Sequence, residues 1–257
     1  MTKVLAPAKL TMSLRIAGVR ADGLHELEAE MVALDLADEL VITEGESGLD
    51  VEAGPTTRAS ALPASGDNLA MRALAAVGRT ASVRLHKRIP LGGGLGGGSA
   101  DAGAVLRWAG CSDLRLALSL GSDVPFCVVG GRALVSGVGE VVRPLPYVPR
   151  ELLLVVPPFG VDTASVYRAW DAAPSSEGPN ELTAAALQVE PRLAAWRDAL
   201  GDLSGRAPTL AGSGSTWFVE GGPPSAGTPD MPDLAVGTER GLLVRARTVP
   251  PGWEGDD

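Results

Sequence analysis

The sequence predicts an α+β protein of two domains, residues 1–149 and 150–257. Its 257 residues are 45% hydrophobic, which is enough for one large packed core or two modest ones. Segments that alternate apolar and polar residues, as strands do, occur together with segments rich in helix formers. Three prolines within residues 144–149 exclude both a helix and a central strand, so this segment is expected to link the domains.

Composition and charge exclude several classes of protein. No apolar run approaches the length of a membrane span, and the first residues lack the apolar core of a signal peptide. The net charge of -9 argues against a nucleic-acid or membrane-surface partner, because either would need a basic face. Cys111 and Cys127 have neither disulfide nor zinc-site spacing, so we expect two small core residues. The sequence thus predicts a cytoplasmic protein in which local cations bind any anionic substrate.

The N-terminal segment predicts a strand over residues 4–16 with a bend at Pro7. Lys9 falls on the polar face of this strand, and a single lysine in such a place is usually solvated. His25 follows in a polar turn, where its simplest role is to cap the turn. The alternating stretch after it, up to residue 43, predicts further strand. The apolar face of the first strand carries Leu10, Met12, Leu14 and Ile16.

The most informative stretch is a glycine loop, residues 92–98, with six glycines in seven positions. It lies between an alternating segment, residues 81–85, and residues 102–108, which predict a helix that begins near Ser99. Glycine permits positive φ and a close approach of backbone N–H groups to an anion, and a helix N-terminus favours phosphate. The loop therefore predicts a nucleotide triphosphate site rather than a flexible linker.

The glycine loop matches neither of the two commonest phosphate-binding motifs. No lysine follows the glycines, so G-x-x-x-x-G-K-[ST] is absent. No strand ending in an acidic residue follows at the spacing of a dinucleotide-binding fold. The loop alone does not determine which reaction the protein catalyses.

Polar residues mark two predicted helix boundaries. Either Asp67 or Asn68 is expected to cap the helix that follows it. Residues 105–120 predict a helix with a break at Gly110, after which Asp123 is the one charge in an apolar neighbourhood. An unpaired buried carboxylate is costly, so Asp123 is either buried with a partner or faces a site.

The remaining segments complete the predicted two-domain pattern. Residues 131–142 predict a hairpin, and residues 152–156 predict a buried strand that opens the second half. A second loop of small residues, 211–216, contains Gly-Ser-Gly, which by itself is an ordinary turn. Further helices are predicted over residues 163–171, 181–187 and 191–200, and further strands over residues 217–219 and 241–248.

Four segments in a fixed order resemble the GHMP kinase superfamily: Pro7-Ala8-Lys9, residues 90–101, residues 121–125 and residues 211–214. The resemblance implies an N-terminal domain like domain 2 of ribosomal protein S5 and a ferredoxin-like C-terminal domain. It also implies an ATP-dependent kinase that uses Mg²⁺, with its active site between the domains.

Longer segments are similar, within this superfamily, to the 4-diphosphocytidyl-2-C-methyl-D-erythritol kinase family. The segment Arg20-Ala21-Asp22-Gly23-Leu24-His25 separates that family from homoserine, mevalonate and galactose kinases. The family phosphorylates the 2-hydroxyl of the methylerythritol unit in non-mevalonate isoprenoid biosynthesis. The other similar segments are residues 6–10, 67–69, 87–90, 92–102, 137–140 and 161–167.

The resemblance implies a role for each matching residue. Asp123 would orient and deprotonate the hydroxyl, and Lys9 would be the cation beside it. These two groups and a backbone cradle suffice for phosphoryl transfer, which needs positioning and charge stabilisation rather than covalent help. Asn68 and Lys87 would lie by the adenine, and Ser99 near Mg²⁺. The ATP phosphates would be held by Pro90, Gly92, Gly93, Gly94, Leu95, Gly96, Gly97, Gly98, Ser99 and Ala100.

The implied acceptor is a small molecule, a cytidine diphosphate-linked polyol. His25 would hydrogen-bond its cytosine, and the ring of Tyr167 would stack on that base. Asp123 and Thr11 would contact the methylerythritol end, and Gly212, Ser213 and Gly214 would close the site there. The protein would be a monomer or a weak homodimer.

Two departures from the family pattern leave alternatives open. Thr11 stands where the family usually has Asn, and Leu24 stands where an aromatic ring usually stacks on the cytosine. A GHMP kinase for another small alcohol, such as homoserine or mevalonate, is therefore one alternative. The other is a non-catalytic nucleotide-binding relative that keeps the fold.

Overall fold

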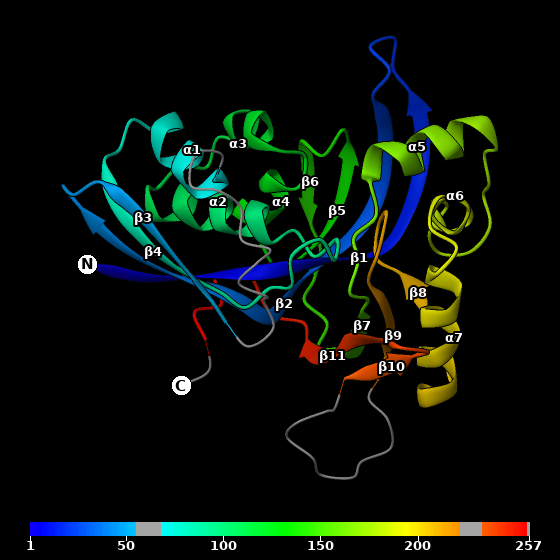
Figure 1. The fold of residues 1–257 in the computed structure, drawn as a ribbon. Helices are drawn as coiled ribbons and strands as arrows, with labels where there is room; N and C mark the ends of the chain where they lie inside the picture. Colours follow the sequence, from blue (N-terminus) through cyan, green and yellow to red (C-terminus); the bar gives the residue numbers. More distant parts are fainter. Residues whose placement is uncertain (55–67, 222–232, 256–257) are drawn as a thin grey trace.

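The computed structural model describes residues 1–54, 68–221 and 233–255, and it confirms the predicted α+β class. Two β-sheets lie next to each other, each with helices packed beside it (Figure 1). Asp67, the alternative helix cap, lies outside the described residues. None of the described helices is long and apolar enough to cross a membrane.

The first sheet belongs to the N-terminal half and consists of β1 (Thr2–Val19), β2 (His25–Glu44), β3 (Gly48–Ala53), β4 (Ala81–Lys87), β5 (Arg132–Gly137) and β6 (Val141–Pro144). The strands are ordered β3-β4-β2-β5-β6, and β1 pairs with β2. The predicted hairpin is confirmed as β5 and β6, which pair antiparallel. The helices on one side of this sheet are α1 (Leu69–Ala76), α2 (Gly97–Trp108), α3 (Leu114–Leu120) and α4 (Val124–Val129) (Figure 1).

β1 is one continuous strand of 18 residues, and the bend predicted at Pro7 is instead an irregularity in its pairing with β2. Two register shifts fall between Pro7 and Lys9 and between Thr11 and Ser13. Such bulges change the direction of side chains, so strict alternation between the two faces is lost. Lys9, Leu10 and Thr11 are all buried, and Lys9 is therefore not the solvated lysine that is usual on a strand.

The helices around the glycine loop begin and end close to their predicted positions. Asn68 caps α1, because its side-chain oxygen accepts a hydrogen bond from the N–H of Ala70 at 2.9 Å. α2 begins at Gly97, two residues before Ser99, near which its start was predicted. The predicted break at Gly110, which has a φ of 71°, separates α2 from α3.

The second sheet belongs to the C-terminal half and consists of β7 (Glu151–Val156), β8 (Thr209–Leu210), β9 (Trp217–Glu220), β10 (Leu234–Val236) and β11 (Glu239–Arg247). Its order is β10-β11-β7-β9-β8, and the sequence analysis missed both β8 and β10. The predicted helices are confirmed as α5 (Thr163–Ala172), α6 (Thr183–Val189) and α7 (Leu193–Ser204). The ring of buried Trp196 on α7 packs on Gly241 of β11, where a Cβ would lie 2.5 Å from it.

The two cysteines differ in their environments. Cys127 is buried, and burial is the main reason why the pKa of its thiol rises to about 12. Cys111 is only half-buried and packs against the edge of the core, so the expected core position is confirmed for Cys127 alone.

The chain passes from the first sheet to the second within the proline-rich segment, since β6 ends at Pro144 and β7 begins at Glu151. The buried hydrophobic side chains of the two halves nevertheless form one continuous cluster. An isolated bridge between Leu34 and Thr248 also joins them. The division into domains at residues 149 and 150 stays a prediction.

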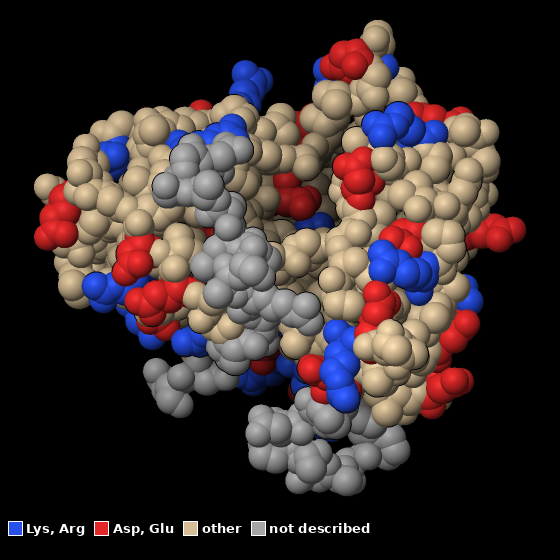
Figure 2. Space-filling view, viewed as in Figure 1, with Lys and Arg blue, Asp and Glu red and all other residues tan. Residues whose placement is uncertain are grey.

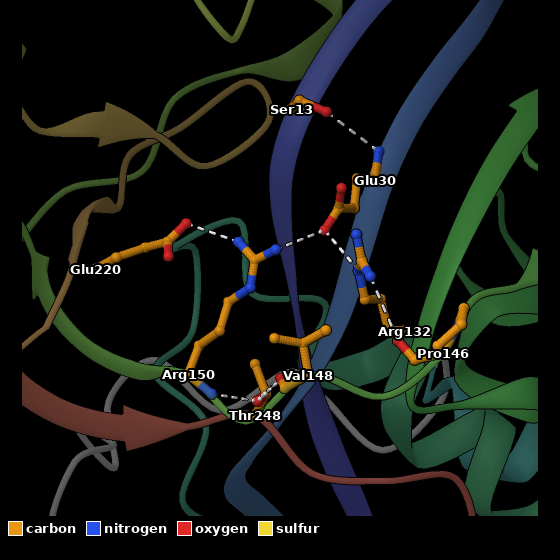
Figure 3. Close-up of polar contacts among 8 residues, drawn as sticks. All are labelled: Ser13, Glu30, Arg132, Pro146, Val148, Arg150, Glu220 and Thr248. Carbon is orange, nitrogen blue, oxygen red and sulfur yellow. Dashed lines mark hydrogen bonds and ion pairs between the residues drawn. The ribbon is translucent and has the colours of Figure 1, made fainter.

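A network of charged side chains connects the two halves beside this segment (Figure 3). Glu30 on β2 accepts hydrogen bonds from Nε of Arg132 at 2.8 Å and from Nη2 of Arg150 at 3.4 Å. Arg150 also donates from Nη1 to Glu220 on β9 at 2.7 Å. One guanidinium therefore bridges a carboxylate of each sheet. The hydrogen bond from Arg132 is the main cause that holds the pKa of Glu30 below its ordinary value.

We expect Glu30→Gln to lower the free energy of unfolding at pH 7 by about 1 kcal/mol, because a neutral amide lacks the negative charge that attracts the two guanidinium groups. The pKa of Glu30 is lower in the folded state, so its stabilising contribution is complete above the ordinary value of 4.5 and is lost as pH falls through the folded-state pKa. Urea unfolding should therefore separate the two proteins at pH 7 and show them converging as the pH falls below 4.5.

The matched control is Glu28→Gln, an exposed position on the same strand. It should change the free energy of unfolding by less than about 0.5 kcal/mol at either pH. A gap between wild type and Glu30→Gln that widens toward low pH would contradict the assigned role of Glu30.

Candidate active site

A hollow opens in the face shown in Figure 2, between the part that carries α1 to α4 and the part that carries α5 to α7. Acidic and basic side chains are visible inside it (Figure 2). At the junction of the two halves, the glycine loop contacts the second small-residue loop, residues 211–216.

The glycine loop requires glycine at several positions. Gly92, Gly94 and Gly96 have φ values of 76°, 76° and 69°, a conformation that side chains rarely adopt. Gly96 is also the N-cap of α2 and makes no side-chain cap hydrogen bond. A glycine has no side chain that could cap the first N–H groups of α2, and with the positive end of the helix dipole these groups form a site for an anion.

Two carbonyl oxygens hold the glycine loop in place. The backbone N–H of Lys9, on β1, donates to the carbonyl of Leu95 at 3.0 Å. Thr216 donates to the carbonyl of Gly93 from its hydroxyl at 2.6 Å and from its N–H at 3.3 Å. The loop is thus fixed on one side by the first sheet and on the other by the second loop.

The second loop lies against the glycine loop and is tied down by Asn180. A Cβ at Gly94 would lie only 2.4 Å from the carbonyl oxygen of Gly214, so the two backbones are in direct contact. The buried side chain of Asn180 donates to the carbonyls of Leu210 at 2.8 Å and Gly212 at 2.7 Å. The sequence analysis missed Asn180, which follows Pro179 in a polar segment without a recognisable motif.

Lys9 and Asp123 form an ion pair, with 3.1 Å between Nζ and Oδ2. The side chain of Lys9 is 9% exposed, whereas that of Asp123 is 28% exposed and still reaches solvent. Lys9 also donates to the hydroxyl of Thr11 at 3.4 Å, and a Cβ on Gly212 would lie 3.6 Å from that hydroxyl oxygen. The sequence left open whether Asp123 is buried with a partner or faces a site. The structure gives it a buried partner, Lys9, and leaves the carboxylate partly exposed.

A second charged cluster lies behind the glycine loop. Lys87 contacts Asp38 and donates to Oδ2 of Asp101 at 2.7 Å, and all three side chains are at most 4% exposed. Burial alone would lower the pKa of Lys87, but the charges of Asp101 and Asp38 raise it on balance. Burial, reinforced by the charge of Asp38, raises the pKa of Asp101 well above its ordinary value despite the charge of Lys87. Asp38 also accepts the N–H of Ile89 at 2.8 Å.

This cluster connects the two ends of the glycine loop, because Lys87 ends β4 and Asp101 belongs to α2. The sequence analysis assigned Lys87 to the adenine site and missed Asp38 and Asp101. Asp101 could have been found as the acidic residue of the segment that follows the glycines. Asp38 carries no such signal, since it lies in a long strand far from the loop in sequence.

A cavity of about 180 Å³ lies beside the glycine loop and is lined in part by Asn68, Lys87, Gly98 and Asp101. The two residues predicted to lie by the adenine therefore share one cavity with a glycine of the loop. The ammonium group of Lys87 is held by two carboxylates. Its contact with a nucleobase stays a prediction.

A larger cavity of about 370 Å³ contains the residues predicted to bind cytosine. His25 begins β2 rather than capping a turn, and its ring lies 4.6 Å from that of Tyr167, centroid to centroid, with a tilt of 36°. Nε2 of His25 lies 2.7 Å from Oδ1 of Asp171, a residue that the sequence analysis did not single out. Burial raises the pKa of Tyr167, and the charge of nearby Asp123 adds to this shift.

The residues present fit a Mg²⁺ ion whose ligands are mostly phosphate oxygens and water. Within the described part of the chain, no group of three or more His, Cys, Asp or Glu side chains could hold a metal ion. Mg²⁺ usually binds through one or two carboxylates together with phosphates and water, so such a group is not required. A Cβ on Gly121 would lie 3.9 Å from Oγ of Ser99, which places this hydroxyl beside the segment that carries Asp123.

Comparisons with known proteins agree with this geometry. The family model described as GHMP kinases N terminal domain matches residues 68–131. A curated protein of Paracoccus denitrificans (strain Pd 1222), named 4-diphosphocytidyl-2-C-methyl-D-erythritol kinase, is 38% identical over 234 residues, which cover 83% of this chain and 84% of that protein. The crystal structure of a 4-(cytidine 5'-diphospho)-2C-methyl-D-erythritol kinase has a TM-score of 0.69 at 35% identity, covering 84% of this chain and 89% of that one.

A more distant structure shares the fold alone. The L. major mevalonate kinase, solved in complex with R-mevalonate, has a TM-score of 0.62 at 13% identity and covers 98% of this chain and 97% of its own. The two-sheet fold and the glycine loop thus define a GHMP kinase, as the sequence predicted. Within that class, the chain belongs to the 4-diphosphocytidyl-2-C-methyl-D-erythritol kinase family.

Replacement of Gly96 tests the packing of the glycine loop against Lys9. A Cβ at Gly96 would lie 2.7 Å from Cγ of Lys9, in addition to the strain of a φ of 69°. We expect Gly96→Ala to lower the free energy of unfolding by about 2 to 4 kcal/mol, because the strain and the steric overlap add. Urea unfolding measures this loss.

Gly78→Ala is the matched control, since Gly78 has a φ of 64° and nothing within 4 Å of its added Cβ. It should cost about 1 to 2 kcal/mol through backbone strain alone. Equal losses in the two variants would show that the contact with Lys9 does not constrain the loop.

Proposed function

We propose that the protein transfers the γ-phosphate of ATP to the 2-hydroxyl of 4-diphosphocytidyl-2-C-methyl-D-erythritol. The observation that carries this proposal is the ion pair of Lys9 and Asp123, in which a half-exposed carboxylate is held by a buried ammonium group. Curated relatives that match most of the length of this chain are named as that kinase. The glycine loop contacts the backbone of the same lysine.

The chemistry follows from what each group can do. Phosphoryl transfer needs a positioned nucleophile and stabilisation of the charge that develops on the transferred group. The Asp123 carboxylate accepts the proton of the acceptor hydroxyl, and Nζ of Lys9 stabilises negative charge beside it. The uncapped N–H groups at the start of α2 bind the ATP phosphates. Mg²⁺, when bound beside Ser99, would neutralise charge on those phosphates.

The cytidine end of the acceptor is assigned to the cavity of His25 and Tyr167. Asp171 accepts a hydrogen bond from Nε2 of His25, and in the tautomer that makes this bond Nδ1 is the acceptor of the ring. A cytosine presents an amino group as donor, whereas uracil presents a carbonyl oxygen at the same position. We therefore assign Asp171 as a positioning residue that fixes the tautomer of His25 and favours cytosine.

The test of the proposed function is a kinase assay with ATP, Mg²⁺ and the cytidyl substrate, run beside homoserine and mevalonate. Turnover of the cytidyl substrate alone supports the proposal. Faster turnover of another alcohol would favour the alternative that Thr11 and Leu24 leave open. No turnover of any acceptor, with ATP still bound, would favour a non-catalytic nucleotide-binding relative.

Asp123→Asn should reduce kcat for the cytidyl substrate by about 100- to 10,000-fold, because the amide cannot accept the proton of the hydroxyl. The dissociation constant of ATP, measured by calorimetry, should stay within about threefold, since Asp123 is assigned to the acceptor side. Asp202→Asn, an exposed carboxylate on α7, serves as the control and should leave both values unchanged. A kcat within about tenfold of wild type would remove Asp123 from the role of proton acceptor.

Asp171→Ala should raise KM for the cytidyl substrate about tenfold with little change in kcat, because it frees the ring of His25 to change its tautomer. It should also lower the preference for the cytidyl substrate, measured as its kcat/KM divided by that of the uridyl analogue. Asp202→Ala should leave this ratio unchanged. A loss of kcat at constant KM would contradict a role confined to positioning His25.

A further inference from the structure

The last turn of α2 carries one basic residue, Arg107, whose side chain is partly buried. A basic side chain at this end of a helix usually interacts with the last carbonyls of its own helix. Arg107 instead donates to carbonyls of two other elements. Its Nη1 donates to Cys127 on α4, and its Nη2 donates to Leu5 on β1 at 2.8 Å. Among the described residues, no carboxylate pairs with this guanidinium, so its contacts join three pieces of backbone.

The contact with α4 fixes the helix that Asp123 begins. Cys127 is among the last residues of α4, where carbonyls have no N–H partner within the helix, and Arg107 supplies one. The N–H of Cys127 donates to the carbonyl of Asp123 at 3.1 Å, which links this residue to the start of the helix. A Cβ at Gly103, one turn before Arg107, would lie 2.8 Å from the Cys127 carbonyl oxygen. The backbones of α2 and α4 are therefore in direct contact at the carbonyl that Arg107 holds.

The contact with β1 lies close to the irregular part of that strand. Leu5 still pairs regularly with β2, but the register shifts between Pro7 and Lys9. A bulge bends a strand and redirects its side chains, so contacts outside the β1–β2 ladder help to fix Lys9. Arg107 holds β1 on one side of the shift, and the hydrogen bond from the N–H of Lys9 to the carbonyl of Leu95 holds it on the other.

We propose that Arg107 is a positioning residue for phosphoryl transfer, because it ties the strand of Lys9 and the helix of Asp123 to the helix that follows the glycine loop. These three elements carry the ammonium group, the carboxylate and the phosphate-binding N–H groups assigned to the reaction. Arg107 donates to backbone carbonyls, so it acts through Lys9 and Asp123 and not on a substrate. The inference rests on the proposed function, since it assigns Arg107 a part in that reaction.

The kinetic test uses Arg107→Met, which keeps the length of the side chain and removes its donors. We expect kcat for the cytidyl substrate to fall about 10- to 100-fold, because a small displacement of the Lys9–Asp123 pair weakens the transition state more than the ground state. KM for this substrate and the dissociation constant of ATP should stay within about threefold. Arg115→Met, an exposed arginine on α3, is the matched control and should change none of these values.

Two further variants separate positioning from charge and from general stability. Arg107→Lys keeps the charge but loses the planar fork of donors, so its kcat should stay within about threefold of that of Arg107→Met. Leu200→Ala removes buried apolar volume from α7 and lowers the free energy of unfolding without touching either carbonyl. Its kcat per folded molecule should stay within about twofold of wild type. If Arg107→Met fails to fold, Arg107→Gln, which can still donate to one carbonyl, replaces it.

A double-mutant cycle tests the same inference without turnover. The coupling between Lys9→Met and Asp123→Asn is measured by urea unfolding, once in the wild-type background and once in the Arg107→Met background. We expect the coupling to fall below about half in the second background, because the separation of 3.1 Å between Nζ and Oδ2 depends on Arg107. If the wild type does not turn over the cytidyl substrate, the proposed function fails, and a reduced coupling still supports Arg107 as the residue that positions the pair.

Four results would overturn the proposal. The first is a kcat within about threefold of wild type in Arg107→Met. The second is an unchanged coupling between Lys9 and Asp123 in the Arg107→Met background. The third is a wild-type kcat in Arg107→Lys, which would assign the effect to charge and not to the bridge between two carbonyls. The last is an equal fall of kcat in Leu200→Ala, which would assign it to stability.

Discussion

The rest of the structure depends on the two carbonyl oxygens that hold the glycine loop. A loop of glycines has many conformations, and its N–H groups can bind an anion in one geometry only if the backbone is fixed from outside. The N–H of Lys9 fixes Leu95, and Thr216 fixes Gly93. Because Lys9 lies on β1 and Thr216 in the C-terminal half, the loop has this geometry only when the two halves are packed together.

The same packing decides the environment of the charged groups. Lys9 is buried between β1, the glycine loop and Gly212, so its ammonium group has few partners besides Asp123 and Thr11. Behind the loop, Lys87 is shared by two buried carboxylates and joins the end of β4 to α2. Breaking a buried charge cluster leaves an uncompensated charge, so both lysines contribute to the position of the loop as well as to its electrostatics.

Other contacts also connect the two halves. Arg150 connects Glu30 of the first sheet with Glu220 of the second (Figure 3), and the N–H of Leu14 on β1 donates to the carbonyl of Pro179 at 2.9 Å. Within the C-terminal half, the neighbouring Asn180 ties the second loop to β8.

The sequence by itself determined the α+β class, the order of most elements and the glycine loop, because these depend on local periodicity and short motifs. Lys9 and Asp123 follow only from the resemblance to the kinase family, and their roles stay predictions. Only the tertiary structure decided which groups are paired. Asp38, Asn180 and Asp171 carry no local signal, and they matter because distant strands and helices place them beside Lys87, Gly212 and His25. The burial of Lys9 likewise follows from bulges in β1, which a strict alternation of residues cannot reveal.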